Sequence, residues 1–535
     1  MTVGITELPN SVEELKNIIR LQASHIQTQA SHIQEIENKL VWAEEKYRAM
    51  AARYFGRKSE KYTAEEDRQN RLFDEAELHA SEQAPPIKEK IVVASHERKR
   101  AGRKPKTAVF PCVEQIHELD ELDRKCDCCG TERPVIGEER TSEYDLVPEH
   151  IVKIVHVRKK YGPCSCEASR REGREGIDIA PGPVKIIPGS DFTNRTIAFF
   201  MTGKYADAIP FYRMEKMLSR FGMAISRATL SNQAIAVGRA ICGLIELIER
   251  DLAASPVLLM DETTVQVLKE GKGSAHKKSY MWVMRGYKKR KPIHRFVYHA
   301  SRSGTFAEEL LRKFQGGYVQ TDGFDGYNRL DHREGIVHVG CFAHIRRKFV
   351  TAWEAAGKTG IAKIPIDHIA RLYKIESELR AAFDRGEIDE ELFLERRKKS
   401  AMPVLEEFRQ WLMDSCLSIA PQSLLGKAIT YAQAVYSRAI RYIEHPLLTP
   451  DTNAVENAIR PFVIGRKNWL FSGSPLGAHA SAGIYSLIET AKANGHDPYR
   501  YLCYIFDRLP LCTSSSEQEA LLPYNVDPDT IMRMG

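Results

Sequence analysis

The chain has 535 residues, of which 43% are hydrophobic and 28% are charged, a composition typical of a soluble globular protein with several domains. Its 78 basic and 71 acidic residues leave a net charge of +7, which permits nucleic acid as a partner but does not argue for it. No stretch approaches 18 consecutive apolar residues and the N-terminus has no secretory signal pattern, so we expect no membrane span and a cytoplasmic location.

Residues 12–55 have the a/d pattern of a coiled coil, with seam residues at alternating steps of four and three. The sequence Gln-Ala-Ser-His-Ile-Gln occurs at 22–27 and again at 29–34, and a repeat offset by seven residues keeps such a seam in register. A helix packed along the protein's own core is the alternative. We expect residues 1–62 to form a coiled coil through which the chain assembles into a homo-oligomer.

A linker at 63–107 follows, and it ends in a short basic arm. Six cations fall within residues 98–106, a density typical of segments that track DNA phosphates or enter the minor groove. A solvated linker is the alternative. The candidate DNA-contacting residues of this arm are Arg98, Lys99, Arg100, Arg103 and Lys104.

Five of the 11 cysteines lie between residues 126 and 166. Cys126 and Cys129 form a C-x2-C pair, and Cys164 and Cys166 form a C-x-C pair. Two thiolate pairs of this kind match a tetrahedral structural zinc site, with buried free thiols as the alternative. Cys128 is a fifth candidate for four places. We expect one structural Zn²⁺ in a domain at 108–182, and buried thiols at the scattered cysteines elsewhere.

The remainder of the chain alternates between helical and strand patterns. Residues 183–250 indicate helices, with Ser226 as an N-cap, which suits either a helix-turn-helix or a plain bundle. Residues 251–349 predict three strands, a helix, two strands and a basic helix, hence a mixed sheet covered by helices. A helical insertion at 350–445, a segment at 446–490 and a helical tail at 491–535 that ends in polar residues complete the chain.

Three carboxylates stand out in this region. Asp261 stands at or near the end of a predicted strand, Asp322 lies just after another, and Glu456 lies at a predicted helix start. Carboxylates that converge from two strands and a helix are the ligands that two Mg²⁺ ions need in phosphoryl transfer. The alternatives are that both aspartates cap turns and that Asn453 and Glu456 form a helix capping box. Two nearby carboxylates compete with them, Glu262 and Asp325.

Four blocks resemble the transposases of the insertion sequence 66 family. They are Asp261-Glu-Thr-Thr-Val-Gln-Val-Leu, Gln320-Thr-Asp-Gly-Phe-Asp-Gly-Tyr-Asn328, Gly340-Cys-Phe-Ala-His-Ile-Arg-Arg-Lys-Phe349 and Asn453-Ala-Val-Glu-Asn-Ala-Ile-Arg-Pro-Phe-Val-Ile-Gly-Arg-Lys-Asn-Trp-Leu-Phe-Ser-Gly473. Further blocks fit in order over nearly the whole chain. The departures are Phe342 where the family has tryptophan, and the C-x-C pair, which puts the fourth zinc ligand in doubt.

The resemblance implies a multidomain α+β protein with a ribonuclease-H-like mixed α/β catalytic core and a helical insertion. The core would follow the coiled coil, the small zinc-binding domain and a helical DNA-binding segment. Asp261, Asp322 and Glu456 would be the catalytic triad of a DDE transposase, with two Mg²⁺ or Mn²⁺ ions. The expected partners are DNA, as element ends and target, and accessory proteins of the same element; the location implied is the bacterial nucleoid.

Basic residues near the triad could hold DNA phosphates. These candidates are Arg346, Arg347, Lys348, Arg460, Arg466 and Lys467. His338, Cys341 and His344 recur at steps of three, and we expect a packing or DNA role for them, not a metal site. Two alternative functions remain open at this point: a DNA-binding regulator without catalysis, and a metal-dependent nuclease that cleaves but does not join.

Overall fold

The computed structural model describes residues 182–270 and 278–533, together with short pieces of the N-terminal region, chiefly 16–30. The predicted zinc cysteines and the basic arm lie outside the described residues. Residues 16–30 are helical, in agreement with that part of the prediction, and Ile19 and Ile26 are exposed there. Pairing of chains through this helix stays a prediction. A two-residue strand, β1 (Lys160–Tyr161), pairs antiparallel with β2 (Asp178–Ile179).

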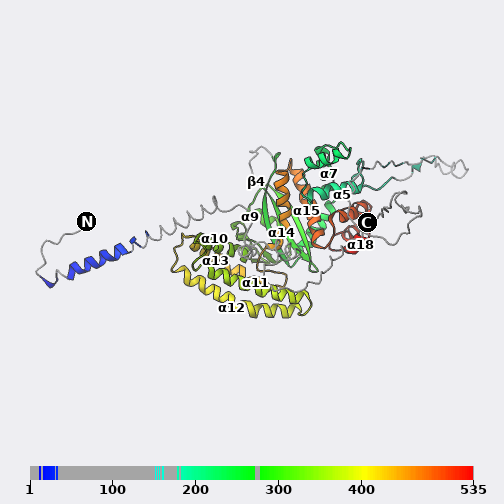
Figure 1. Cartoon of the computed structure of the whole chain (residues 1–535). Helices are drawn as coiled ribbons and strands as arrows, with labels where there is room; N and C mark the ends of the chain where they lie inside the picture. The colour runs from blue at the N-terminus through cyan, green and yellow to red at the C-terminus, as the bar shows by residue number, and fades with distance from the viewer. Residues whose placement is uncertain are drawn as a thin grey trace, which may run out of the picture. The chain divides into compact units, whose positions relative to one another are not determined.

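A five-stranded mixed sheet lies at the centre of the described body (Figure 1), in the order β5-β4-β3-β6-β7. Its strands are β3 (Val257–Gln266), β4 (Lys278–Lys288), β5 (Lys291–His299), β6 (Gly317–Gln320) and β7 (Ile336–Val339). β3 is antiparallel to β4 and parallel to β6. The mixed α/β sheet is therefore confirmed. We expected the first strand to end near Asp261, but β3 continues to Gln266 because its second half pairs with β4 alone.

One face of the sheet is covered by three helices, α8 (Cys242–Ala253), α14 (Asn453–Trp469) and α15 (Pro475–Ala493). The ring of Phe296, on β5, stacks on Tyr485 of α15 with 5.5 Å between centroids. A second layer of helices packs behind them, α5 (Asn194–Tyr205), α7 (Arg227–Ala240) and α16 (Pro498–Arg508). In Figure 1, α14 and α15 lie next to the sheet and α5 and α7 lie beyond them.

The opposite face carries α9 (Gly304–Leu310) and the 3-10 helix η2 (Asp325–His332). Trp282, on β4, is fully buried and contacts Phe306 of α9 and Tyr327 of η2, with ring centroids 5.5 and 6.1 Å apart. Adjacent residues of β4 therefore pack into two separate apolar layers, because side chains alternate along a strand. This explains the continuous apolar run at 280–284 in β4.

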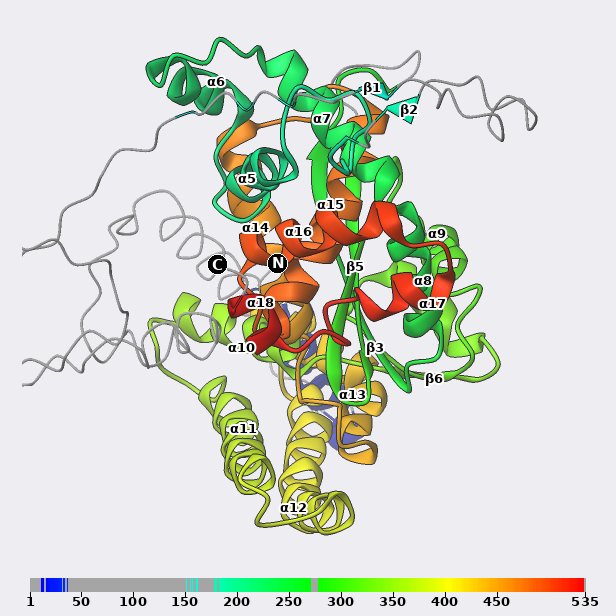
Figure 2. The same cartoon turned by 90° about the vertical axis from the view of Figure 1, so that its right-hand side faces the viewer.

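After β7 the chain enters α10 (Phe342–Ala355) and then a helical region. Its elements are α11 (Lys363–Asp384), α12 (Glu390–Cys416), α13 (Leu424–Ala439) and η3 (Ile440–Glu444). α11 and α12 pack as a helical pair that extends away from the sheet (Figure 2). Fully buried Arg397, on α12, donates to Glu376 of α11 at 2.7 Å and to the carbonyl oxygen of Leu448 at 3.1 Å. The insertion is thereby anchored to the segment that leads into α14.

Two expectations, one for the C-terminal segment and one for the scattered cysteines, are wrong in this structure. The C-terminal elements are η4 (Leu509–Leu511), α17 (Ser515–Ala520) and α18 (Pro528–Met532). We expected a polar tail here, but Leu522 and Tyr524 are buried in the core. We also expected the scattered cysteines to be buried, but Cys242 and Cys416 are exposed. No helix in the described part of the chain is long and apolar enough to span a bilayer.

The predicted helix-turn-helix segment consists of α6 (Phe211–Arg220) and α7. Ser226 caps α7, as predicted, because its hydroxyl accepts from Thr229 N at 3.1 Å. α7 packs tightly on α15, and a Cβ at Gly238 would lie 2.7 Å from the Cβ of Ala480. One face of α7 is therefore committed to the core.

Candidate active site

Asp261, in β3, and Asp322, two residues after β6, occupy matching positions relative to two neighbouring parallel strands. Leu259 of β3 pairs with Gln320 of β6, and each aspartate comes two residues later in the chain. The pairing of β6 with β7 continues to Thr321, whose N–H donates to the carbonyl oxygen of Val339 at 3.0 Å. Because parallel strands run in the same direction, both aspartates reach the same end of the sheet.

A buried glutamine brings the segment before α14 to this same end. Gln320 is fully buried, and its Nε2 donates to the carbonyl oxygens of Gly340 at 3.2 Å and Thr449 at 2.8 Å. It thus joins the ends of β6 and β7 to the loop from which α14 begins. α14 packs against β3, and Glu456 lies in its first turn. The short loop after Thr449 therefore delivers the third carboxylate.

Asp261 is buried and lies near other negatively charged side chains. Burial raises the pKa of Asp261 well above its usual value, and the negative charges of Glu262, Glu456 and Asp322 raise it further. A like charge has this effect when it lies close by in a poorly solvated site. The three predicted catalytic carboxylates therefore interact electrostatically, from two strands and a helix.

The donor chemistry fits divalent cations. Mg²⁺ and Mn²⁺ prefer carboxylate oxygens, and a cation would offset the repulsion between the negative charges gathered here. Among the described residues, however, no three acidic, histidine or cysteine side chains are arranged closely enough to hold a metal ion. Metal binding at Asp261, Asp322 and Glu456 therefore stays a prediction.

Glu262, the nearest competing carboxylate, is used by the fold itself. Neighbouring residues in a strand point to opposite faces, so Glu262 lies on the side of η2. Its side chain is 1% exposed, Arg302 Nε lies 2.5 Å from its Oε1, and the hydroxyl of Tyr327 donates to its Oε2. Burial nevertheless raises the pKa of Glu262. Asp325, the other competitor, is exposed at the start of η2.

The helix-capping alternative for Glu456 is wrong in this structure. The N-cap of α14 is Thr452, and Asn453 lies inside the helix as its first residue. The backbone N–H of Asn453 donates to Asp451 Oδ1 at 3.0 Å. Glu456 instead accepts from the hydroxyl of Thr452, with 3.0 Å between Thr452 Oγ1 and Glu456 Oε1.

The turn-capping alternative is right for Asp322, which follows β6, but wrong for Asp261, which lies inside β3. Asp322 Oδ1 accepts from Phe324 N at 3.0 Å, and Asp261 Oδ1 accepts from Glu262 N at 2.8 Å. Each contact uses one of the two carboxylate oxygens. A structural contact and a role in binding are therefore compatible at both positions.

Cys341 and His344 lie beside Glu456, which the sequence did not reveal. His344 Nδ1 is 3.2 Å from Cys341 Sγ and 4.0 Å from Glu456 Oε1. Burial raises the pKa of Cys341 to about 12, and the charges of Asp451 and Glu456 act in the same direction, so the thiol is neutral near pH 7. Thr452, which joins these groups, escaped notice because its only sequence signal is its place four residues before Glu456.

His338 has the packing role that we preferred for it. It is 1% exposed, and its two ring nitrogens lie 2.8 Å from Thr321 Oγ1 and 2.7 Å from Asp331 Oδ1. Burial lowers the pKa of His338. It braces β6, β7 and η2 behind the candidate site.

The structure divides the basic residues predicted to contact DNA. Arg346 is 3% exposed, so the prediction that it contacts DNA is wrong in this structure. Arg466 donates to the hydroxyls of Thr263 at 3.1 Å and Thr264 at 3.0 Å, which fastens α14 to β3. The remaining candidates of the core are exposed or half-buried, namely Arg347, Lys348, Arg460 and Lys467.

A row of cations on α6 was missed from the sequence. Arg213, Lys216 and Arg220 are exposed, and steps of three and four residues place them on one side of the helix. The opposite side buries three apolar residues, Phe211, Met214 and Leu218. The spacing of these cations is visible in the sequence and could have revealed the row once α6 was taken as an amphipathic surface helix.

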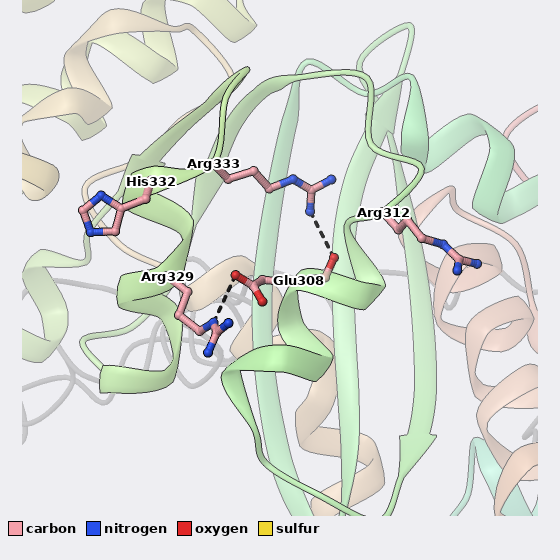
Figure 3. Close-up of a pocket in the computed structure, with 5 residues that line it drawn as sticks. All are labelled: Glu308, Arg312, Arg329, His332 and Arg333. Carbon is pink, nitrogen blue, oxygen red and sulfur yellow. Dashed lines mark hydrogen bonds and ion pairs between the residues drawn. The ribbon is translucent and has the colours of Figure 1, made fainter.

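A basic pocket of about 370 Å³ lies between α9 and η2 (Figure 3). Its lining residues are Glu308, Arg312, Arg329, His332 and Arg333. Arg329 pairs with the Glu308 carboxylate at 3.0 Å, and Arg333 donates to the Glu308 carbonyl oxygen at 3.0 Å, both drawn as dashed lines in Figure 3. Two of the three guanidinium groups therefore fasten α9 to η2, so the pocket is chiefly a structural joint.

These features define a mixed α/β protein with an acidic site at the end of a five-stranded sheet. Three known protein-family descriptions match the chain. The family "Transposase IS66 family" matches residues 189–480, "IS66 C-terminal element" matches 486–524, and "Transposase C of IS166 homeodomain" matches 42–114. The chain therefore belongs to the IS66 family of transposases, and membership gives it a transposase role.

Curated relatives match along most of their length. Three uncharacterized proteins of Sinorhizobium fredii are similar to this chain. The protein y4qI is 30% identical over 474 residues, which cover 86% of this chain and 84% of y4qI. The protein y4jD is 29% identical over 425 residues (77% and 80%), and y4hP is 26% identical over 474 residues (83% and 82%). No solved structure matches the chain.

Proposed function

We propose that the protein is the DNA transposase of a bacterial insertion sequence, which binds the ends of its element and cleaves and joins DNA strands in a DDE-type, metal-dependent reaction. Asp261, Asp322 and Glu456 would hold two Mg²⁺ or Mn²⁺ ions. The matching register of Asp261 and Asp322 on parallel strands carries this assignment. Family membership supports transposition, and the mixed sheet with its strand order supports a ribonuclease-H-like core.

The reaction has two displacements at phosphorus. Water attacks the phosphodiester at the element end and releases a 3′-hydroxyl and a 5′-phosphate. The oxygen of that 3′-hydroxyl then attacks a target phosphodiester, which joins the strands and releases a target 3′-hydroxyl. Bound divalent ions supply acidity to the attacking group and charge stabilisation to the leaving oxygen. The protein holds three carboxylates in place from β3, β6 and α14.

The basic surface supplies the DNA contacts in this proposal. The α6 row, Arg213, Lys216 and Arg220, forms one exposed positive surface, and Arg347 and Lys467 are exposed cations of the core. Phosphate contacts of this kind give affinity without reading sequence. The structural Zn²⁺ at Cys126, Cys129, Cys164 and Cys166, the basic arm, the homo-oligomer through the coiled coil and the accessory proteins complete the proposal.

A strand-transfer assay tests the proposal. Labelled element ends, target DNA and Mg²⁺ are incubated with the protein and with Asp261→Asn, and we expect joined products only with the wild type. Asp325→Asn is the matched control, because Asp325 is an exposed carboxylate close in sequence to Asp322, and it should join DNA normally. Full joining activity in Asp261→Asn would refute the residue assignment.

The same assay separates the two other function classes. A nuclease that cleaves but does not join would give cut ends without joined products in the wild type. A regulator without catalysis would bind the ends but give neither product, and Asp261→Asn would bind them equally well. Either result in the wild type overturns the proposal.

A further inference from the structure

α14, the helix that carries Glu456, begins at a threonine whose hydroxyl does not cap it. Thr452 is the N-cap residue, but its side chain accepts no hydrogen bond from the first-turn N–H groups. Its Oγ1 lies 3.0 Å from Glu456 Oε1 and 3.3 Å from Cys341 Sγ. Thr452 is 1% exposed, so solvent cannot easily replace these partners. The side chain therefore serves the carboxylate and not the helix end.

A different residue holds the start of α14. Asp451 accepts from the backbone N–H of Asn453 at 3.0 Å and from Asn453 Nδ2 at 3.1 Å. An N-cap threonine ordinarily stabilises a helix by about 1 kcal/mol through its hydroxyl. Because Asp451 organises this turn, the hydroxyl of Thr452 is available for Glu456.

Cys341 connects this hydroxyl to the end of β7. The sulfur is fully buried and accepts from Thr452 N at 3.4 Å. A hydroxyl has one proton to donate, and a carboxylate is a stronger acceptor than a thiol sulfur. The Thr452 hydroxyl thus donates to Glu456. The sulfur of Cys341 holds Thr452 in place by accepting from the backbone N–H of Thr452.

We propose that Thr452 is a positioning residue that fixes the carboxylate of Glu456 through Oε1, and that Cys341 anchors Thr452 to the sheet that carries Asp322. This inference rests on the proposed function, in which Glu456 is a metal ligand. Both Thr452 and His344 approach the same carboxylate oxygen, Oε1. Fixing one oxygen orients the other, and orientation of a ligating carboxylate by a hydrogen bond typically changes metal affinity or activity by about 10- to 100-fold.

Two substitutions at Thr452 separate the hydroxyl from the packing. Thr452→Val keeps the branched shape and removes the hydroxyl, whereas Thr452→Ser keeps the hydroxyl and removes the methyl group. For Thr452→Val we expect turnover in end cleavage to fall about 10- to 100-fold and the Mg²⁺ concentration for half-maximal rate to rise. KM for DNA should be unchanged, and Thr452→Ser should cleave close to the wild-type rate.

The contrary results are distinct. Wild-type turnover and Mg²⁺ dependence in Thr452→Val overturn the inference, and so does an equal loss in the Val and Ser variants, which would indicate packing alone. If Thr452→Val fails to fold in a thermal melt, Cys341→Ala serves in its place. It removes the anchor but keeps the hydroxyl, so it should show the same changes to a smaller degree, and unaltered turnover overturns the inference.

Glu456→Gln distinguishes failure of this inference from failure of the proposed function. Full activity in Glu456→Gln would refute the catalytic assignment itself. An inactive Glu456→Gln together with a fully active Thr452→Val would refute only the positioning role.

Discussion

Replacing Asp261 by asparagine should abolish DNA joining and at the same time stabilise the fold. Asparagine keeps the size of the side chain and an oxygen that accepts from Glu262 N, a contact of 2.8 Å in this structure. It also removes the negative charge of the carboxyl group. Burial and the charges of Glu262, Glu456 and Asp322 raise the pKa of that carboxyl group well above the usual 3.8. The substitution thus relieves an unfavourable interaction and removes the proposed metal ligand.

The direction of the stability change in Asp261→Asn follows from proton linkage. A carboxyl group with a raised pKa binds its proton more tightly when folded, so the charged form destabilises the native state as pH rises above the unfolded pKa. Each unit of pKa elevation corresponds to about 1.4 kcal/mol, and about 1 kcal/mol shifts Tm by roughly 2–4 °C in a domain of this size. We therefore expect Asp261→Asn to melt above the wild type at pH 8, with the difference vanishing near pH 3.

Thermal melts with and without Mg²⁺ complete the assay. At ten times its Kd, a bound ion stabilises the native state by about 1.4 kcal/mol, and this gain should appear in the wild type and be lost in Asp261→Asn. The exposed residue Asp325 again provides the control, because Asp325→Asn should leave both the Tm and the Mg²⁺ response unchanged. An Asp261→Asn protein that melts at or below the wild type at pH 8, or that gains as much from Mg²⁺, would refute the reasoning.

Three further predictions concern other parts of the chain. Glu262→Ala should lower the free energy of unfolding by about 1–3 kcal/mol in denaturant titration, because Arg302 and the buried hydroxyl of Tyr327 lose their acceptor, and joining should persist; complete loss of joining would contradict the structural role of Glu262. Changing Arg213, Lys216 and Arg220 together to Gln should weaken DNA binding and reduce the slope of log affinity against log salt concentration by up to about 3. The same change at three exposed cations of α12, Arg396, Lys398 and Lys399, should leave the slope unchanged. Equal slopes in the wild type and the α6 variant would exclude α6 from the DNA interface. Cys126→Ser should lose the zinc that elemental analysis finds in the wild type, and a wild type without zinc would refute the metal domain.

Much of the fold follows from local pattern. Three strands were expected at the start of the 251–349 region and are present as β3, β4 and β5, and Ser226 caps α7 as its sequence position predicts. The end of β3 was misjudged because the sequence does not show that β4 alone extends the pairing beyond Leu259. The C-terminal segment was misjudged because Leu522 and Tyr524 follow a run of seven polar residues at 513–519, and only tertiary contacts show that they are buried.

The candidate site, like the fold, could be predicted from the sequence only in part. Asp261 and Asp322 could be chosen because strands deliver them, and strand pairing brings them together. The burial of Arg346 and the bond from Thr452 to Glu456 could not be read from the sequence. The burial of Arg346 depends on how α10 rotates against its neighbours, which helical periodicity alone does not specify. The bond from Thr452 is local, but the sequence does not show that this hydroxyl turns to Glu456 and not to the helix end.

The central claim is that carboxylates from β3, β6 and α14 form one metal site. Anomalous scattering from crystals of the protein with Mn²⁺ and element-end DNA tests it most directly. We predict Mn²⁺ peaks contacted by Asp261, Asp322 and Glu456, and loss of those peaks in Asp261→Asn. Peaks held by other residues, or no peaks here in crystals whose protein cleaves DNA, would contradict the account.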